Sequence, residues 1–211
     1  PVSQAQPHFG HTGTTDGSGR VGFGDARIVT VEDVAGRRTA PSARYQPVLG
    51  TLGFVWDQAA DQVLLIHRTR RPDRKHNGLG GKLEPNEDIV TGMARELHEE
   101  AAIVPTAMRL RGTISWPGFE GPGGDDWFGF LFLITRWTGE IPDSNDEGEL
   151  SWVPRSRLMA WCDPATRADS GLDLHEGDTH FLPLLFDDDP RPFHALMPWE
   201  QGRPIGWSVT R

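Results

Sequence analysis

Three glutamates, Glu96, Glu99 and Glu100, are the residues whose type and spacing most clearly indicate chemistry. On a helix each residue is rotated by about 100° from the one before it, so Glu96 and Glu100 differ by about 40° and Glu99 lies about 60° to the other side. The three carboxylates would therefore share one patch of a helix face. Like charges at this spacing repel, and a hard divalent cation such as Mg²⁺ would neutralise them. The alternative is a solvated acidic helix face, the more common meaning of paired glutamates.

The surrounding residues predict the helix that this patch requires. Apolar side chains recur every four residues and form one stripe that would face a core. These are Ile89, Met93, Leu97 and Ala101. Asn86 or Asp88 can cap the first N–H groups, and Glu87 and Asp88 lie at the positive end of the helix dipole. We therefore expect the glutamates to lie beside a buried stripe.

The spacing of residues 81–103 resembles the Nudix box. Gly81 is followed after five residues by Glu87, after seven more by Arg95-Glu96-Leu97, after one more by Glu99-Glu100 and after two more by Ile103. One position departs, because the box has glycine where this chain has Ala102. Alanine there would cost at most about 1 kcal/mol if its φ is positive, and every candidate ligand stays in place.

The resemblance implies the Nudix fold, an α/β (α+β) sandwich in which a mixed β-sheet lies between helices and the box forms a loop–helix–loop. It also implies hydrolysis of a nucleoside diphosphate linked to another group, with Mg²⁺ or Mn²⁺ as the cofactor. The implied metal ligands are Glu96, Glu99, Glu100, a carbonyl near Gly80 or Gly81, and one acidic residue from a loop outside the box. Glu147 fits this last position best, because it stands five residues before Trp152, and Glu149 is the alternative.

The same resemblance assigns catalytic roles to Glu99, Glu100, Arg95 and Glu147. Arg95 would orient the carboxylates through the bidentate hydrogen bonds that a guanidinium favours. The reaction would be in-line attack of a metal-activated water on a phosphorus, and the cations would offset charge on the leaving diphosphate.

From about Leu49 to Arg211 the chain is similar to the MutT-like branch, which removes oxidised purine nucleotides. The similarity is carried by Asn-Gly-Leu-Gly-Gly-Lys at 77–82, by Glu147 before Leu-Ser-Trp-Val, and by Asp-Thr-His-Phe-Leu-Pro-Leu-Leu at 178–185. It implies that Asn77 and Asp178 contact the base, although Asp178 could equally be a helix N-cap. The predicted reaction is hydrolysis of a purine nucleoside triphosphate, such as 8-oxo-dGTP, to the monophosphate and pyrophosphate.

Arg68 and Lys82 are the further candidates for substrate binding. Arg68 begins the densest basic stretch of the chain, 68–76, which runs directly into the Gly-rich turn that ends at Lys82. Positive charge at this place would attract phosphates, although most of the stretch would be a solvated loop.

Two other functions remain open. An ADP-ribose or sugar-nucleotide pyrophosphatase is the alternative enzyme, because Pro117 lies fourteen residues past the box and is followed by Gly118 and Phe119. The other alternative is a Nudix domain that senses nucleotides without cleaving them. Degenerate domains of that kind usually lose box carboxylates, and this chain keeps all of them.

Composition and charge limit the class further. The 211 residues are 24 % charged and 36 % hydrophobic, which is ordinary for a soluble domain with extensions. The single cysteine, Cys162, excludes an internal disulfide and a Cys-based zinc site. A net charge of −9 argues against general nucleic-acid binding. With no apolar run of about eighteen residues and no recognisable signal peptide, we expect a cytoplasmic enzyme with a nucleotide as its partner and no membrane contact. The oligomeric state is not predicted.

We expect an N-terminal extension at residues 1–44 and a Nudix domain at 45–211. Residues 7–24 are rich in small and polar residues and indicate a flexible segment, and 27–34 is a possible short strand. Within the domain we predict strands at 49–56, 63–67, 108–116, 127–137 and 150–153, a short helix at 179–186, and a closing hairpin from 193–198 and 205–210.

Overall fold

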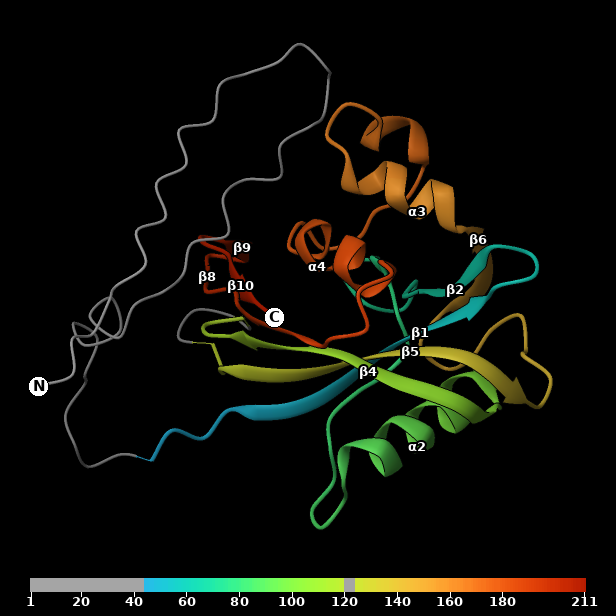
Figure 1. Ribbon diagram of the computed structural model, residues 1–211, viewed down its shortest axis with the longest axis horizontal. Coiled ribbons are helices and arrows are strands. Elements are labelled where there is room, and N and C mark those ends of the chain that lie inside the picture. Colours follow the sequence, from blue (N-terminus) through green and yellow to red (C-terminus); the bar gives the residue numbers. More distant parts are fainter. Residues whose placement is uncertain (1–43, 120–123) are drawn as a thin grey trace, which may run out of the picture.

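The computed structural model describes residues 44–119 and 124–211, and these residues form one large mixed sheet with helices on both faces (Figure 1). The predicted extension, apart from Arg44, and its possible strand lie outside the described residues. The sheet confirms the predicted fold class of a mixed β-sheet between helices.

The strand order is β10-β7-β4-β5-β1-β2-β3, and β6 pairs with the free edge of β2. The strands are β1 (Val48–Asp57), β2 (Gln62–His67), β3 (His76–Asn77), β4 (Val104–Trp116), β5 (Trp127–Thr138), β6 (Glu149–Pro154), β7 (Phe193–Leu196) and β10 (Ser208–Thr210). The β1–β5 and β4–β7 pairs are parallel, and the other pairs are antiparallel. A separate two-stranded ribbon joins β8 (Trp199–Glu200) to β9 (Arg203–Pro204).

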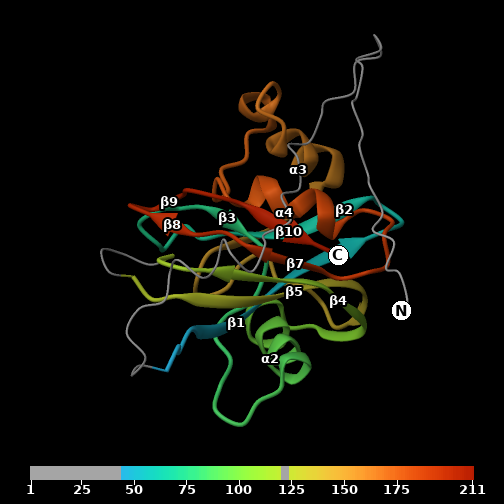
Figure 2. The same cartoon turned by 60° about the vertical axis from the view of Figure 1, so that its left-hand side comes forward.

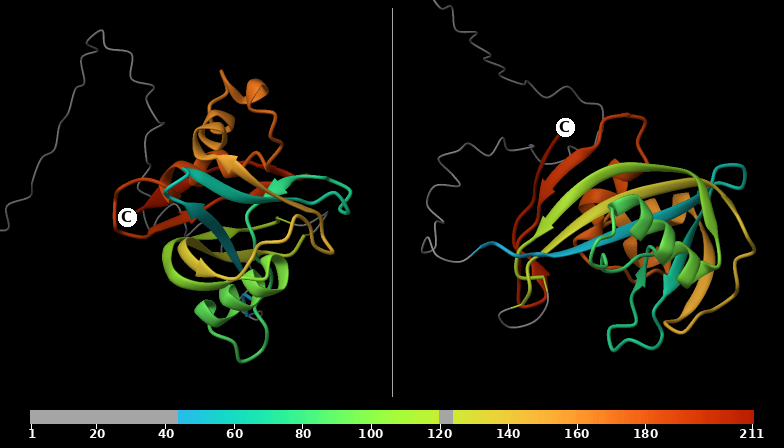
Figure 3. Two further views of the ribbon diagram at one scale, coloured as in Figure 1. Left: turned by 90° about the vertical axis from the view of Figure 1, so that its right-hand side faces the viewer. Right: turned by 90° about the horizontal axis from the view of Figure 1, so that it is seen from below.

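The helices lie on opposite faces of this sheet, as Figures 2 and 3 show from three further directions. Helix α2 (Ile89–Ala101) covers one face, while α3 (Arg155–Cys162), the 3₁₀ helix η1 (Arg167–Ser170) and α4 (Asp178–Leu185) lie on the other. None of the helices in the described part of the chain is long and apolar enough to cross a membrane.

Strand β5 contributes apolar side chains to the cores on both faces of the sheet. Leu131 and Leu133 belong to the core on the α4 face, whereas Phe132 and Ile134 belong to the core on the α2 face. A strand with apolar residues at consecutive positions is suited to burial on both sides. Both faces of β5 are therefore covered.

Helix α2 begins and ends where local chemistry requires. Of the two proposed caps, Asp88 is the one that acts, because its side chain accepts hydrogen bonds from the N–H groups of Val90 and Thr91 at 2.8 and 3.1 Å. The helix ends at Ala102, whose φ of 55° lies in the left-handed region that favours glycine. Met93, Leu97 and Ala101 are fully buried, as the apolar stripe predicted.

Helix α4 is held at its C-terminal end by a buried arginine of β4. Arg111 is 1 % exposed, and its guanidinium donates to the carbonyl oxygens of Leu184 and Leu185 and to those of Asp187 and Asp189 at 2.7 to 3.0 Å. The last carbonyls of a helix lack partners within the helix, so these bonds satisfy them and fix α4 against the sheet. Helices α3 and η1 and the short strand β3 are elements that the sequence did not predict.

Candidate active site

Arg95 gathers the carboxylates of the first half of the site. It lies on α2 and makes a bidentate ion pair with Glu87, with distances of 2.9 and 3.0 Å. Its Nη1 also contacts Glu96 at 2.9 Å and Glu99 at 3.0 Å, and its Nη2 donates to the carbonyl of Lys82. These carboxylates raise the pKa of Arg95, chiefly through Glu87. One guanidinium therefore holds three acidic side chains against the end of the Gly-rich turn.

Arg68 binds the carboxylates on the other side of the patch. Its guanidinium is buried and contacts Glu147 at 2.5 Å and Glu100 at 3.5 Å, and it reaches the carbonyl of Gly80 at 3.5 Å. Asn145 adds a second link, because its Nδ2 donates to the carbonyl of Glu100 and its Oδ1 accepts from the N–H of Glu147. The acidic loop before β6 is thereby attached to the end of α2.

The two glycines lie directly against the carboxylates. The N–H of Gly80 donates to Glu100 Oε2 at 2.7 Å. A Cβ placed on Gly81 would lie 2.5 Å from Glu96 Oε1, a separation that real Cβ atoms do not show. Gly80 has a φ of 141° and its own Cβ would clash with the backbone of Thr51. Glycine is therefore required at Gly80 by the backbone of Thr51, whereas a side chain at Gly81 would displace the Glu96 carboxylate.

The charges of this cluster are not balanced. Five carboxylates, Glu87, Glu96, Glu99, Glu100 and Glu147, contact three guanidiniums, those of Arg68, Arg71 and Arg95. Burial raises the pKa of Glu100 to about 7, and the nearby carboxylates of Glu147 and Glu96 raise it further while Arg68 opposes them. Burial also raises the pKa of Glu96. The cluster thus carries an excess of two negative charges when fully ionised.

One divalent cation would neutralise that excess, and the donors are hard oxygens of the kind that Mg²⁺ and Mn²⁺ accept. Among the residues that the structure describes, however, no three acidic, histidine or cysteine side chains already stand as a metal-binding group. The arginines explain this, because each carboxylate is drawn to a guanidinium instead of to a common point. The donor set fits the cation chemically, and the side chains would have to turn toward it.

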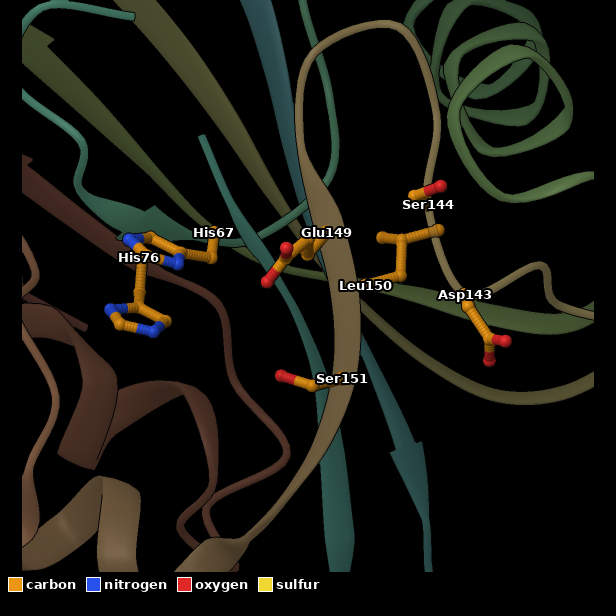
Figure 4. A pocket seen from close by; sticks show the side chains of 7 residues that line it. All are labelled: His67, His76, Asp143, Ser144, Glu149, Leu150 and Ser151. Carbon is orange, nitrogen blue, oxygen red and sulfur yellow. The ribbon is translucent and has the colours of Figure 1, made fainter. Parts of the chain in front are cut away.

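Glu149, the alternative to Glu147, lies in other surroundings. It is paired with His67 across β6 and β2 and lines an open pocket of about 490 Å³ together with His76 and Ser151. Figure 4 shows its carboxylate and Ser151 on the same side of β6 as the two histidines, whose rings stack 4.4 Å apart. Glu147, by contrast, contacts the arginine that reaches Glu100.

Of the candidate base-binding residues, Asp178 belongs to α4, and Asn77 is the last residue of β3, directly before the Gly-rich turn that reaches the acidic patch. The ammonium group of Lys82 lies 5.2 Å from the centre of the Trp127 ring. Phe119 contacts the rings of Trp127, His175 and Trp199, with centroids 6.1, 6.1 and 5.0 Å apart. Asn77 precedes the turn, and its Oδ1 accepts from the N–H of Gly78 at 2.9 Å.

Asp178 is the first residue of α4 and is not its N-cap. Gly177 occupies the cap position, and no side chain makes a capping bond there. The capping alternative is therefore wrong, because the helix begins one residue earlier than predicted. The carboxyl group of Asp178 is buried, and its Oδ2 has no hydrogen-bond partner in the part of the chain that the structure describes. This burial raises the pKa of Asp178 to about 8.

Sequence reasoning did not identify Phe119, Trp199 or Asn145 as site residues. The Nudix box lies within one helix and one turn, whereas these residues come from a hairpin tip, the β8 strand and the acidic loop. The only local signal for any of them was that Asn145 stands in the acidic loop, two residues before Glu147.

Comparison with known proteins agrees with this geometry. The model of the NUDIX domain family matches residues 47–173, more than half of the chain, and the chain belongs to the Nudix hydrolase family. The uncharacterized Nudix hydrolase YvcI of Bacillus subtilis is 30 % identical over 129 residues, which are 61 % of this chain and 73 % of that protein. Enzymes of this family act on nucleotides and generally use divalent metal ions.

Solved structures show the same fold. The crystal structure of a MutT protein from Bacillus halodurans is 25 % identical and has a TM-score of 0.63, with 77 % of this chain and 97 % of that chain covered. A NUDIX hydrolase from Nitrosomonas europaea, 20 % identical, has a TM-score of 0.53 over 70 % of this chain and 93 % of that one. The predicted family and enzyme class are confirmed.

Proposed function

We propose that this Nudix hydrolase cleaves a purine nucleoside triphosphate, an oxidised one such as 8-oxo-dGTP, to the monophosphate and pyrophosphate. The observation that carries the proposal is the position of the Gly-rich turn at 77–82. Gly80 and Gly81 contact the acidic patch, while the ammonium group of Lys82 lies over the ring of Trp127. Trp127 belongs to the aromatic cluster, which consists of Phe119, Trp127, His175 and Trp199. One nucleotide could therefore extend its phosphates to the carboxylates and its base to the rings. The similarity to a protein named MutT supports the same branch.

In this proposal Glu96, Glu99, Glu100 and Glu147 hold Mg²⁺ or Mn²⁺, with a carbonyl of Gly80 or Gly81 as a further ligand. When bound, the cation lowers the pKa of a water and offsets charge on the leaving diphosphate. Glu147, the loop carboxylate that joins the patch, is either one of these ligands or the base that accepts the proton of the attacking water. Arg95 and Arg68 orient the carboxylates, and a cationic Lys82 attracts the phosphates. Asn77 and Asp178 contact the base.

The metal requirement is tested by Glu99→Gln. The Glu99 side chain is 56 % exposed and contacts Arg95, so we expect the fold to survive, while kcat falls by about 10²- to 10³-fold through lost electrostatic stabilisation. Circular dichroism and release of pyrophosphate in Mg²⁺ provide the two readings. Turnover like that of the wild type, or full activity in excess chelator, would contradict the proposed site.

The substrate is tested with a panel of triphosphates, oxidised triphosphates, ADP-ribose and dinucleoside polyphosphates, with Mg²⁺ present. We expect 8-oxo-dGTP or another purine triphosphate to have the highest kcat/KM. Asn77→Ala should raise KM or remove the preference among bases more than it lowers kcat, because the amide would bind the base and not the reacting phosphorus. Much faster cleavage of ADP-ribose would favour the pyrophosphatase alternative. Tight binding without cleavage of any compound would favour a nucleotide sensor.

A further inference from the structure

Asp178, at the start of α4, and Trp199, in β8, each carry a buried polar atom that has no hydrogen-bond partner among the described residues. Asp178 and Trp199 are 7 % and 8 % exposed, and neither Asp178 Oδ2 nor Trp199 Nε1 makes a hydrogen bond within the described residues. The Cζ2 atom of Trp199, on the nitrogen-bearing edge of the indole, lies 3.0 Å from where a Cβ on Gly177 would be. Gly177 directly precedes Asp178. The donor edge of the indole therefore lies beside the residue that leads into the carboxyl group.

Trp199 is held in this orientation by its neighbours. Its backbone N–H donates to the carbonyl of Pro117 at 2.8 Å, which ties β8 to the tip of the β4–β5 hairpin. Its ring packs edge-on against Phe119, with centroids 5.0 Å apart and an interplanar angle of 84°. An indole nitrogen can only donate, and a buried donor without an acceptor costs about 1–3 kcal/mol. A ligand acceptor would remove that cost.

The rings that contact Phe119 include those of Trp127 and Trp199, whose indole nitrogens can only donate. Trp127 Nε1 is a third buried atom without a partner among residues 44–119 and 124–211, and the Trp127 ring contacts Phe119. With its pKa raised to about 8, Asp178 keeps its proton at neutral pH and can donate as well. Each carbonyl oxygen of an oxopurine offers two lone pairs, whereas a ring nitrogen of an aminopurine offers one. The surplus of donors thus favours a base rich in carbonyl groups.

We propose that Trp199 determines base specificity by donating its indole N–H to a carbonyl oxygen of an oxopurine that lies against Phe119 and Asp178. This role rests on the proposed function, since it assumes that the nucleotide base enters the aromatic cluster. Trp199 touches the base and not the reacting phosphorus, so it affects which base is bound and leaves the hydrolysis step to the carboxylates. An ordered water that satisfies the indole is the competing explanation.

The test removes the N–H while keeping an aromatic ring, and removes its acceptor from the ligand in parallel. Wild type and Trp199→Phe are titrated calorimetrically with 8-oxo-dGMP, with dGMP, which lacks O8, and with 2-aminopurine deoxyriboside monophosphate, which lacks both O8 and O6. The step from the first to the second ligand reports on O8, and the step from the second to the third reports on O6. In the wild type, loss of the bonded carbonyl should weaken binding by about 10- to 100-fold. In Trp199→Phe the corresponding step should shrink to less than about 3-fold. Trp137→Phe, whose ring stacks on Trp152 away from this cluster, is the matched control.

If removal of each carbonyl weakens binding equally in the wild type and in Trp199→Phe, the proposal is overturned. That result would favour an ordered water as the partner of the indole N–H. Should Trp199→Phe fail to fold, ¹⁵N–¹H spectra of the tryptophan indoles of the wild type give a second measurement. One indole resonance should move downfield with 8-oxo-dGMP and not with the analogue that lacks the bonded carbonyl, and identical spectra would overturn the proposal.

These experiments separate the two proposals from each other. The wild type could cleave no triphosphate while the monophosphate titrations still show that the effect of the carbonyl depends on Trp199. In that case the proposed reaction fails and the role of Trp199 stands. If the wild type cleaves 8-oxo-dGTP and no such dependence appears, the reaction stands and the role of Trp199 fails.

Discussion

Glu147 and Glu149 are two residues apart, and their surroundings differ in a way that can be measured. Glu147 forms an ion pair with the buried Arg68, which also reaches Glu100, whereas Glu149 faces the pocket beside His67. We expect Glu147→Gln to lower kcat by about 10²-fold or more, because it would remove a metal ligand or the general base. Glu149→Gln should stay within about 3-fold of the wild type, and steady-state release of pyrophosphate measures both. A loss confined to Glu149→Gln would show that the wrong loop acid has been assigned.

Asp178 should make stability depend on pH. Burial raises its pKa to about 8 from an ordinary 3.8, with Lys75 opposing the shift, so between these values the folded chain keeps a proton that the unfolded chain releases. The free energy of unfolding should therefore fall as pH rises through this range and level off above about 8. Asparagine is neutral throughout, and Asp178→Asn should gain about 1–3 kcal/mol relative to wild type between pH 5 and 9.

Urea unfolding at four pH values measures this difference, and Asp188→Asn, at an exposed position, is the control. Cys162 faces the same region, and burial raises the pKa of its thiol to about 12, with Asp178 adding to the rise. The thiol therefore stays neutral over the range tested. A constant difference between wild type and Asp178→Asn across that range would show that the carboxyl group is solvated.

At the scale of elements, the end of α2 shows a departure from the family pattern whose cost can be determined. Ala102 has a φ of 55°, where glycine is favoured. Ala102→Gly should stabilise the fold by about 0.5–1 kcal/mol and leave kcat unchanged. The neighbouring Ala101 is helical and fully buried, so Ala101→Gly should destabilise by about 1 kcal/mol or more. Urea unfolding of both variants checks the pair, and a loss of stability in each would contradict this interpretation of the turn.

Elements with strong local patterns were predictable and the others were not. The period of four around Met93 and Leu97 predicted α2, and the apolar runs predicted β1, β2 and β5 nearly to the residue. Helix α3 follows Pro154 and buries only Leu158 and Trp161, so it has too little periodicity to predict. Strand β3 is two residues long, and it forms because His76 and Asn77 pair with β2. No pattern in its own sequence predicts this pairing.

The site shows the same division. The carboxylates on α2 share one face because of helix geometry, which the sequence alone determines. The ion pair between Arg68 and Glu147 joins residues 79 positions apart, and Phe119 meets Trp199 only because two segments fold together at the hairpin tip. No local pattern contains these contacts, so the aromatic side of the site appears only in the structure.

At the scale of the whole molecule, the sheet separates two cores. Of the described residues, none belongs to both the cluster on the α2 face and the cluster on the α4 face. Ile134→Val on the first face and Ile114→Val on the second should each cost about 0.5–1.5 kcal/mol, and the double variant should cost their sum within about 0.5 kcal/mol. Ile134→Val with Met93→Leu is the control, because both side chains meet at Gly53.

Urea unfolding of the single and double variants provides these values. A clear deviation from additivity between Ile134 and Ile114 would mean that the two faces respond as one core. We expect such a deviation only for the control pair, whose side chains share a site.

The separation of the two faces also bears on how such an enzyme can change over generations. Three of the glutamates that would carry the hydrolysis belong to α2, whereas Phe119, Trp199 and Asp178 pack on the other side of the sheet. After gene duplication, substitutions around α4 and β8 could therefore change which nucleotide base is bound. The acidic patch would meanwhile be maintained by selection for hydrolysis. For directed evolution, we expect a library confined to the aromatic cluster to retain more active members than one of equal size spread over both faces.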